Sequence, residues 1–328
     1  MDTWWSSRSR FGSALVAAVA LAVAATSAAP PARERDTFGV LRSDGILIPF
    51  ASYDNGKWSS NWPIDLKGIN LPIALEDVPV GWWGPAGPDA SWKALLSSGM
   101  RDLKLLRPIQ MPIFCTGRLG ILTDYRGKAP EPGPTVPKEG LAFAGGAKVD
   151  EINAVSKFVP DWKRVIDLIT DKFNAAEMRA ADAFTNWRHP YPQDRRREFP
   201  IVLETLYRTA DKTKRGAWST SYVEAVRRFP PAPRDKGCGL ITYVYGWIRE
   251  QADKAPQIDL AARVTYCDRE GVPFIAPLGR VTLNDEIYWV YQLSSWRDEM
   301  YAISRIRPDE VKPIVAMEGG MCTREQVR

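Results

Sequence analysis

Short apolar runs separated by turn-forming residues fill most of the chain. In the first part, the runs FGVL and ILIPFASY flank Asp44-Gly45, and the second run ends at Asn55-Gly56. Asp-Gly and Asn-Gly supply the positive φ angles that tight hairpin turns require. Eight runs rich in β-branched and aromatic residues follow between residues 201 and 317. This spacing predicts antiparallel β-structure, as a meander, a sandwich or a barrel, rather than βαβ units.

One long helix is predicted to interrupt the β pattern. Between Trp162 and Trp187, apolar side chains recur every three or four residues after the helix-start signal Pro160-Asp161. The resulting apolar stripe needs a large partner, most simply a sheet face. Ser91 before the run WKALLSS and Gly99 after it predict a second, shorter helix. The expected fold class is mainly β (α+β): antiparallel meander, sandwich or barrel-like sheets with one long packed amphipathic helix.

A cluster of prolines marks the expected boundary between two modules. Residues 128–140 (KAPEPGPTVPKEG) contain four prolines and predict a linker or long loop. The expected organisation is a cleaved signal peptide over 1–28, a β-rich module over 29–127, the linker over 128–140, and a module of one helix and antiparallel strands over 141–328.

The first 28 residues have the parts of a secretory signal peptide. Arg8 and Arg10 form the basic region, residues 14–25 (ALVAAVALAVAA) form the apolar region, and cleavage is expected after Ala28 within a small-residue site. The apolar run is shorter than the roughly 20 residues that a membrane-spanning helix needs, so a permanent anchor is the weaker interpretation. We therefore expect a secreted or periplasmic protein with no transmembrane segment after cleavage.

Export makes the four cysteines candidates for disulfide bonds. None has the C-x-x-C spacing of a zinc or thioredoxin-type redox site. Cys238 begins the strand-like run CGLITYVYGWI, and Cys267 ends the run IDLAARVTYC, so an antiparallel hairpin would bring the two together. We predict a Cys238–Cys267 disulfide and a second one between Cys115 and Cys322. The alternative is buried free thiols.

Composition excludes several classes of protein and site. With 45% apolar and 25% charged residues over 328 positions, the chain is globular rather than disordered, fibrous or multi-span. The single histidine, His189, is too few for His-rich metal sites, and after the long helix it is more simply a solvated helix cap than a catalytic base. P-loop, GxGxxG, EF-hand and G-x-S-x-G motifs are missing from the sequence. No catalytic residue, metal site or cofactor is therefore predicted.

Five of the 13 tryptophans lie within 35 residues. Exposed indole faces stack on sugar rings and other flat groups, and the indole N–H donates one directed hydrogen bond. One interpretation of this Trp-rich segment is a binding surface; the alternative is that the rings fill a core or cover a sheet edge. The candidate binding residues are Trp58, Trp62, Trp82, Trp83 and Trp92.

Basic residues gather in one stretch, although the whole chain carries a net charge of only +5. Between Arg195 and Lys236, 11 basic residues stand against five acidic ones, a balance of +6. A basic face could meet anionic lipid headgroups, an acidic polymer or an acidic protein, whereas nucleic acid is not expected outside the cytoplasm. The alternative is a set of solvated loops and strand faces. The candidate residues are Arg195, Arg196, Arg197, Lys212, Lys214 and Arg215.

Binding is the function that these features predict. We expect an exported, non-enzymatic envelope or extracellular protein that binds a glycan, an acidic polymer or an envelope protein through the Trp-rich segment or the basic face. The alternative is a secreted, glycosidase-like hydrolase whose carboxylates converge only in the fold, because glycoside hydrolysis needs two acids at a defined separation.

Overall fold

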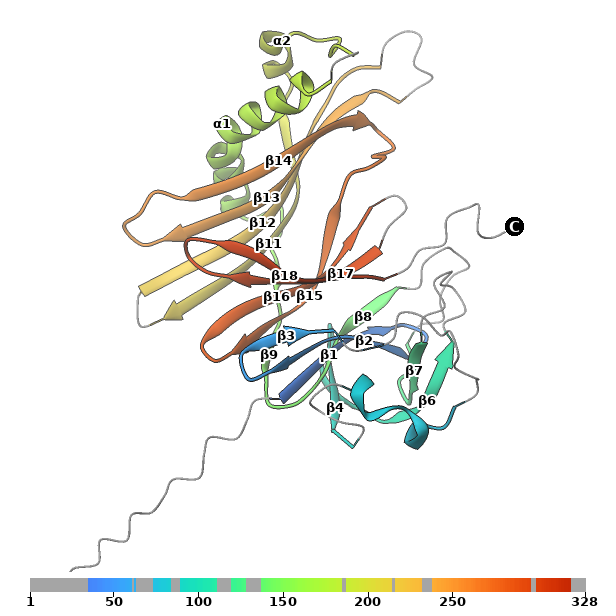
Figure 1. Ribbon diagram of the computed structural model, residues 1–328. Helices are drawn as coiled ribbons and strands as arrows, with labels where there is room; N and C mark the ends of the chain where they lie inside the picture. The colour runs from blue at the N-terminus through green and yellow to red at the C-terminus, as the bar shows by residue number, and fades with distance from the viewer. Residues whose placement is uncertain are drawn as a thin grey trace, which may run out of the picture. The chain divides into compact units, whose positions relative to one another are not determined.

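Three antiparallel β-sheets and one long helix make up the described part of the chain (Figure 1). The fold class predicted from the sequence, mainly β with one long helix, is confirmed. The computed structural model describes residues 35–60, 62, 73–83, 89–110, 119–127, 137–184, 187–213, 216–231, 238–295 and 299–319.

The first sheet takes its strands from the N-terminal part of the chain. Its strand order is β5-β4-β8-β1-β2-β7-β6, and β3 pairs with β2. Gly45 and Gly56, with φ angles of 83° and 81°, form the two hairpin turns that the sequence predicts. The elements are β1 (Arg35–Arg42), β2 (Ile46–Asp54), β3 (Lys57–Ser59), η1 (Leu75–Asp77), η2 (Val80–Trp82), β4 (Trp92–Leu96), β5 (Gly99–Leu103), β6 (Leu105–Gln110), β7 (Leu119–Thr123) and β8 (Lys138–Ala144).

The short helix predicted after Ser91 is wrong, because this segment forms the hairpin of β4 and β5. Leu96 pairs with Gly99, whose φ of 109° suits a tight turn. Trp92, Ala94 and Leu96 point to one face and enter the core, a period of two that is typical of a strand.

The first sheet includes strands on both sides of the Pro-rich segment. β8 begins at Lys138, inside the predicted linker 128–140, and pairs with β1 and β4. Residues 128–136 and the predicted signal peptide, 1–28, lie outside the described residues.

The second and third sheets come from the C-terminal part. The second sheet has the order β18-β17-β16-β15-β9, and the third has the order β10-β11-β12-β13-β14. The second sheet contains β9 (Lys148–Asp150), β15 (Phe274–Leu283), β16 (Glu286–Ser294), β17 (Glu299–Ile306) and β18 (Val311–Glu318). The third contains β10 (Asn153–Ala154), β11 (Ile201–Thr213), β12 (Gly216–Arg228), β13 (Leu240–Gln251) and β14 (Gln257–Tyr266).

The long helix predicted from the apolar stripe is α1 (Pro160–Asp182), which ends before Trp187. Pro160 occupies its first turn, where the missing N–H costs no hydrogen bond. Its apolar stripe, centred on Val165 and Phe173, packs on one face of the third sheet. A short helix, α2 (Gln193–Arg197), follows. Within the described residues, neither helix is long and apolar enough to cross a membrane.

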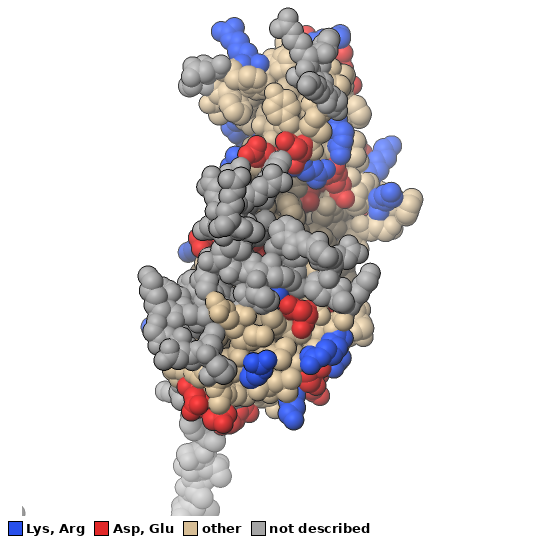
Figure 2. Space-filling model, turned by 90° about the vertical axis from the view of Figure 1, so that its right-hand side faces the viewer, with Lys and Arg blue, Asp and Glu red and all other residues tan. Residues whose placement is uncertain are grey.

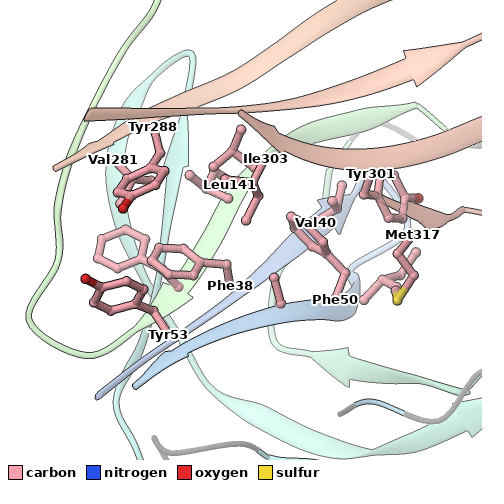
Figure 3. Packing of buried hydrophobic residues seen from close by; sticks show 14 of the residues in the cluster. Phe38, Val40, Phe50, Tyr53, Leu141, Val281, Tyr288, Tyr301, Ile303 and Met317 are labelled. Atoms are coloured by element: carbon pink, nitrogen blue, oxygen red, sulfur yellow. The ribbon is translucent and has the colours of Figure 1, made fainter. Parts of the chain in front are cut away.

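The central strands of the second sheet are buried on both of their faces. Along β16, Tyr288 and Val290 pack toward the first sheet, whereas Trp289 and Tyr291 pack toward the third. Figure 3 shows the contact between the first and second sheets, where side chains of β1 and β2 meet those of the second sheet. The other face of the third sheet carries α1, so each described sheet has at least one apolar face covered.

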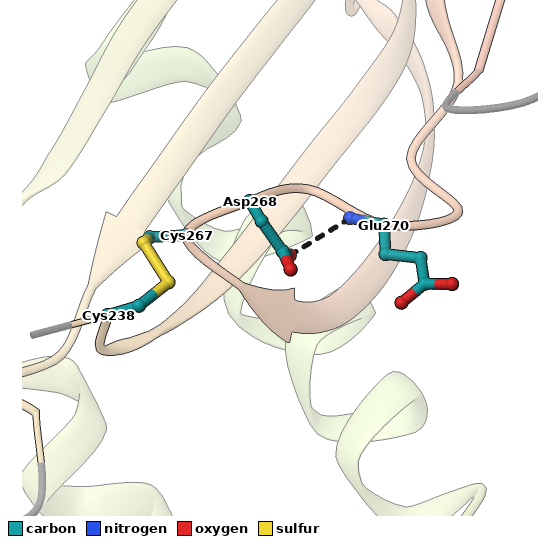
Figure 4. The surroundings of a disulfide bond; sticks show 4 residues. All are labelled: Cys238, Cys267, Asp268 and Glu270. Atoms are coloured by element: carbon teal, nitrogen blue, oxygen red, sulfur yellow. Dashed lines mark hydrogen bonds between the residues drawn. A yellow bond between two sulfur atoms is a disulfide. The ribbon is translucent and has the colours of Figure 1, made fainter. Parts of the chain in front are cut away.

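The disulfide predicted between Cys238 and Cys267 is confirmed (Figure 4). Their Cα atoms are 5.4 Å apart, at the ends of β13 and β14 that the hairpin brings together. Beside the bridge, the N–H of Cys267 donates to the backbone oxygen of Gly239 at 3.0 Å. The predicted partners Cys115 and Cys322 lie outside the described residues.

Candidate functional site

The Trp-rich segment packs mainly into the hydrophobic core that covers one face of the first sheet. Trp62, Trp83 and Trp92 are buried, whereas Trp58 and Trp82 are half-buried. The rings of Trp62 and Trp83 meet with centroids 5.4 Å apart. This burial is what the alternative interpretation of the segment, a core role, predicts.

The hollow that three of these rings line is too small for a ligand. The hollow next to Trp62, Trp82 and Trp83 has a volume of about 10 Å³. That volume is about the size of one water-sized probe, so a sugar ring does not fit into it. Among the described tryptophans of the segment, only the half-buried rings offer surface to a partner.

The basic residues singled out in the sequence have different surroundings. Arg195 is exposed and pairs with Glu198 at 3.1 Å, and Arg197 is exposed. Arg196 is buried, and its Nε lies 3.6 Å from the carboxylate of Glu177. Lys214, Arg215 and the side chain of Lys212 lie outside the described residues.

Other basic residues of the same stretch are neutralised by acids. Arg227 pairs with Glu177, a buried residue of α1, and Arg228 pairs with Glu204 at 2.6 Å. Arg208 pairs with Asp161 at the start of α1. On the face that Figure 2 shows, acidic and basic side chains of the described residues lie intermixed. The excess of +6 in the sequence therefore does not form one continuous basic surface among these residues.

His189 packs among aromatic rings. The Phe229 and Tyr191 rings lie 4.7 and 6.2 Å from it between centroids, and the N–H of Tyr191 donates to Nδ1 at 3.1 Å. Burial and the nearby charge of Arg196 lower the pKa of His189 to about 4, so the ring is neutral at pH 7. Its half-buried position differs from the solvated cap that the sequence favours.

A hollow of about 580 Å³ lies along β14, at one end of the third sheet. This volume is in the range of ligand sites. Four consecutive residues of β14, Ile258 to Ala261, line the hollow. Lys172 and Arg179 line the hollow from α1, on one face of the third sheet, whereas Tyr291 lines it from the second sheet, on the other face, so the hollow extends around the outer side of β14, the last strand. The hollow therefore meets the backbone of β14.

The outward-facing backbone groups of β14 follow from its hydrogen bonds to β13. The bond from Cys267 to Gly239 continues a ladder that keeps one register from Tyr266 to Gln257. In an antiparallel ladder, alternate residues direct N–H and C=O toward the partner. Odd-numbered residues of β14 thus face β13, and even-numbered ones face outward. We call these outward groups the free edge of β14; they belong to Ile258, Leu260, Ala262 and Val264, and no described strand pairs with them.

The free edge lacks three forms of protection found at other sheet edges in the described residues: a short strand, a proline and a shifted register. Proteins protect edges with short strands, proline or bulges. The end strands β5, β9 and β10 have five, three and two residues. β6 and β18 contain Pro108 and Pro313 and pair through shifted registers. By contrast, β14 has ten residues, no proline and no shift.

Aromatic side chains form one wall of the hollow. Trp247 lies 5.1 Å from Tyr222 and 6.4 Å from Tyr291 between ring centroids, and Tyr245 and Leu293 complete this wall. Tyr245 and Trp247 are half-buried and offer ring surface to the hollow. Burial raises the pKa of Tyr222 and of Tyr291, so both hydroxyls stay neutral.

The opposite wall comes from α1 and is basic. Lys172, Ala175 and Arg179 line the hollow from one side of the helix. Both basic side chains are exposed, and neither has an ion-pair partner among the described residues. The wall therefore carries two charges that are not neutralised within this part of the chain.

Gly246 brings β13 close to the hollow-lining part of β14. A Cβ at this position would lie 2.0 Å from the backbone oxygen of Asp259. Real Cβ atoms do not approach oxygen so closely, so the local geometry of the two strands requires glycine.

The hollow holds one carboxylate among its described lining residues, Asp259. This carboxylate pairs with Arg249. Glu224 is close by but buried, and its Oε1 accepts the N–H of Ile275 at 3.2 Å. Burial raises the pKa of Glu224. The alternative hydrolase needs two accessible acids, and this hollow offers one that is already paired.

Comparison with known proteins assigns no family, because no protein-family model, curated protein or solved structure matches the chain. Within the described residues, no group of three or more His, Cys, Asp and Glu side chains could hold a metal ion.

The sequence interpretation missed the free edge of β14. In the run from Ile258 to Val264, apolar residues alternate with Asp259 and Arg263 except at Ala261, and this pattern indicates a strand with one buried face. That this strand ends a sheet depends on strand order, which local pattern does not encode.

Proposed function

We propose that the protein is an exported, non-enzymatic binding protein that takes up an extended segment of a partner protein as an additional strand on the free edge of β14. One observation carries the proposal: consecutive residues of β14, a ten-residue end strand with no proline and no register shift, line a hollow of about 580 Å³. Strand addition gives affinity through main-chain hydrogen bonds and specificity through pockets for alternate side chains.

The periodicity of the free edge favours a peptide over a glycan. Outward N–H and C=O groups recur at every second residue of β14, about 7 Å apart. A polypeptide in extended conformation repeats its own donors and acceptors at this spacing, whereas sugar hydroxyls do not. The four lining residues span about 13 Å, which accommodates about four residues of an added strand.

Export is supported by two features. The N-terminal sequence has the form of a signal peptide, and the Cys238–Cys267 disulfide is typical of oxidising compartments. Expression of the full chain in a Gram-negative host, followed by mass spectrometry of the intact protein, tests this part. A mature chain that begins at Ala29 supports export, and a chain that keeps residues 1–28 contradicts it.

Hydrogen exchange tests the proposed strand addition. The probe is an acetylated, amidated eight-residue peptide of alternating valine and threonine. In the free protein, we expect the amide hydrogens of Leu260 and Ala262 to exchange fast and those of Asp259 and Ala261 to be protected. Binding of the peptide should protect Leu260 and Ala262 selectively. Protection without this alternation, or no protection at saturating peptide, would contradict the proposal.

Two tryptophan substitutions provide a test and its control. Ala261→Trp fills the hollow and should weaken peptide binding at least tenfold, whereas Met100→Trp, at an exposed position of β5 in the first sheet, should leave it unchanged. Circular dichroism verifies that both variants fold. Analytical ultracentrifugation addresses a competing occupant, because a second copy paired through β14 would appear as a dimer and would overturn the proposal.

A further inference from the structure

We infer that the segment bound at β14 alternates acidic and apolar side chains, with the acidic ones turned toward α1. This inference rests on the proposed strand addition. It names the chemistry of the partner from the two walls of the hollow, which differ in charge and polarity.

The α1 wall selects for negative charge. Lys172 and Arg179 are seven residues apart, or about 10 Å along the helix axis, with the small Ala175 between them. Acidic side chains two or four positions apart on an added strand are about 7 or 13 Å apart, and long basic side chains reach either.

No acid of the described residues forms an ion pair with this wall, and that includes Asp167 and Asp171 on the same helix. Asp161 and Glu250 are both bonded to Arg164. Asp259 belongs to the opposite face of β14, where it pairs with Arg249. Asp182 lies one turn beyond Arg179 and is exposed, and no ion pair joins the two among the described residues.

The other wall selects for apolar groups. Tyr245, Trp247, Tyr291 and Leu293 present ring and aliphatic surface, and Tyr291 bonds its hydroxyl to Ser304 at 2.8 Å. An acidic side chain placed here would lose water without gaining a cation, which is costly.

An added strand can satisfy the preferences of the basic wall and of the aromatic wall at the same time. Because successive side chains of a strand point to opposite faces, a segment on the free edge of β14 would present every second residue to Lys172 and Arg179 and the others to the aromatic wall. The pattern that fits is therefore acidic and apolar in alternation.

Three peptides of equal length test the inference by isothermal titration calorimetry at low salt. They alternate valine with glutamate, with glutamine or with lysine. We expect the glutamate peptide to bind about three- to thirtyfold more tightly than the glutamine peptide, and the lysine peptide to bind most weakly. High salt should remove most of the difference.

Variants of α1 assign the effect to its basic wall. Lys172→Gln combined with Arg179→Gln should abolish the preference for glutamate over glutamine. Lys163→Gln, which removes an exposed charge from the opposite side of the same helix, should preserve it. If the glutamate and glutamine peptides bind equally, the inference falls while strand addition stands. If none of the peptides binds, the proposed function itself falls.

Discussion

The disulfide between Cys238 and Cys267 closes the end of the β13–β14 hairpin, next to the hydrogen bond from the Cys267 N–H to the backbone oxygen of Gly239. The bridge joins positions 29 residues apart in sequence and holds the strand whose free edge lines the hollow. It therefore connects the stability of the third sheet to the candidate site.

Removal of this bridge should destabilise the protein substantially. For a loop of this length, loss of the cross-link is expected to lower the free energy of unfolding by about 3.5 kcal/mol, mainly because the unfolded chain gains freedom. Urea denaturation of Cys238→Ala combined with Cys267→Ala measures the effect. A midpoint equal to that of the parent protein would show that the bridge adds no stability.

The ion pair of Lys138 and Glu299 makes a second test possible. Lys138 on β8 bonds Glu299 on β17 at 2.8 Å, and both side chains are buried. Burial lowers the pKa of Lys138, while Glu299 opposes this shift. Lys138→Met leaves the Glu299 carboxylate without its cation and should cost about 3 to 5 kcal/mol of stability.

A double variant separates the contribution of the ion pair from the effect of changed side-chain packing. Glu299→Gln, added to Lys138→Met, removes the orphaned charge and should recover a large part of the lost stability, because buried pairs contribute little over neutral replacements. Additive losses in a double-mutant cycle would instead indicate that the two side chains act independently.

His189 should make stability depend on pH in the acidic range. The pKa in the folded protein is about 4, below the ordinary value of 6.5, so between these values the unfolded chain binds more protons. This contribution is present in full above pH 6.5 and is lost as the pH falls toward 4. Partial exposure of the ring limits the expected loss to about 1 to 2 kcal/mol.

Comparison with His189→Asn isolates this effect from other titrating groups. Asparagine keeps an acceptor for the N–H of Tyr191 but does not titrate. Denaturation curves at pH 7.5 and 4.5 should show a smaller loss for the variant than for the parent. Parallel losses would assign the acid sensitivity to the carboxylates.

Local pattern predicts those parts of the fold that depend on neighbours in sequence. The turns at Gly45 and Gly56, the stripe of α1 and the Cys238–Cys267 hairpin all belong to this class. Around Trp92 the helical and strand periods differ over only a few residues, and a strand forms because Trp92, Ala94 and Leu96 all pack into one core cluster.

The candidate site depends on contacts that are remote in sequence. Lys172 and Trp247 line one hollow although 75 positions separate them, and β14 becomes an edge only through the order of five strands. The Trp-rich segment also depends on such contacts. Its five clustered indoles are visible in the sequence, but the packing of the first sheet against Trp83 determines that this ring is buried.

Gly246 gives a direct test of how β13 shapes the hollow. A methyl group at this position would lie 2.0 Å from the Asp259 backbone oxygen, so Gly246→Ala must push β14 away from β13. We expect a loss of about 2 kcal/mol or more in the free energy of unfolding, together with weaker peptide binding. Gly81→Ala is the matched control, because a Cβ there meets nothing within 4 Å. If both variants unfold at the same urea concentration as the parent, β13 and β14 are not held as closely as the structure shows, and the hollow cannot depend on Gly246.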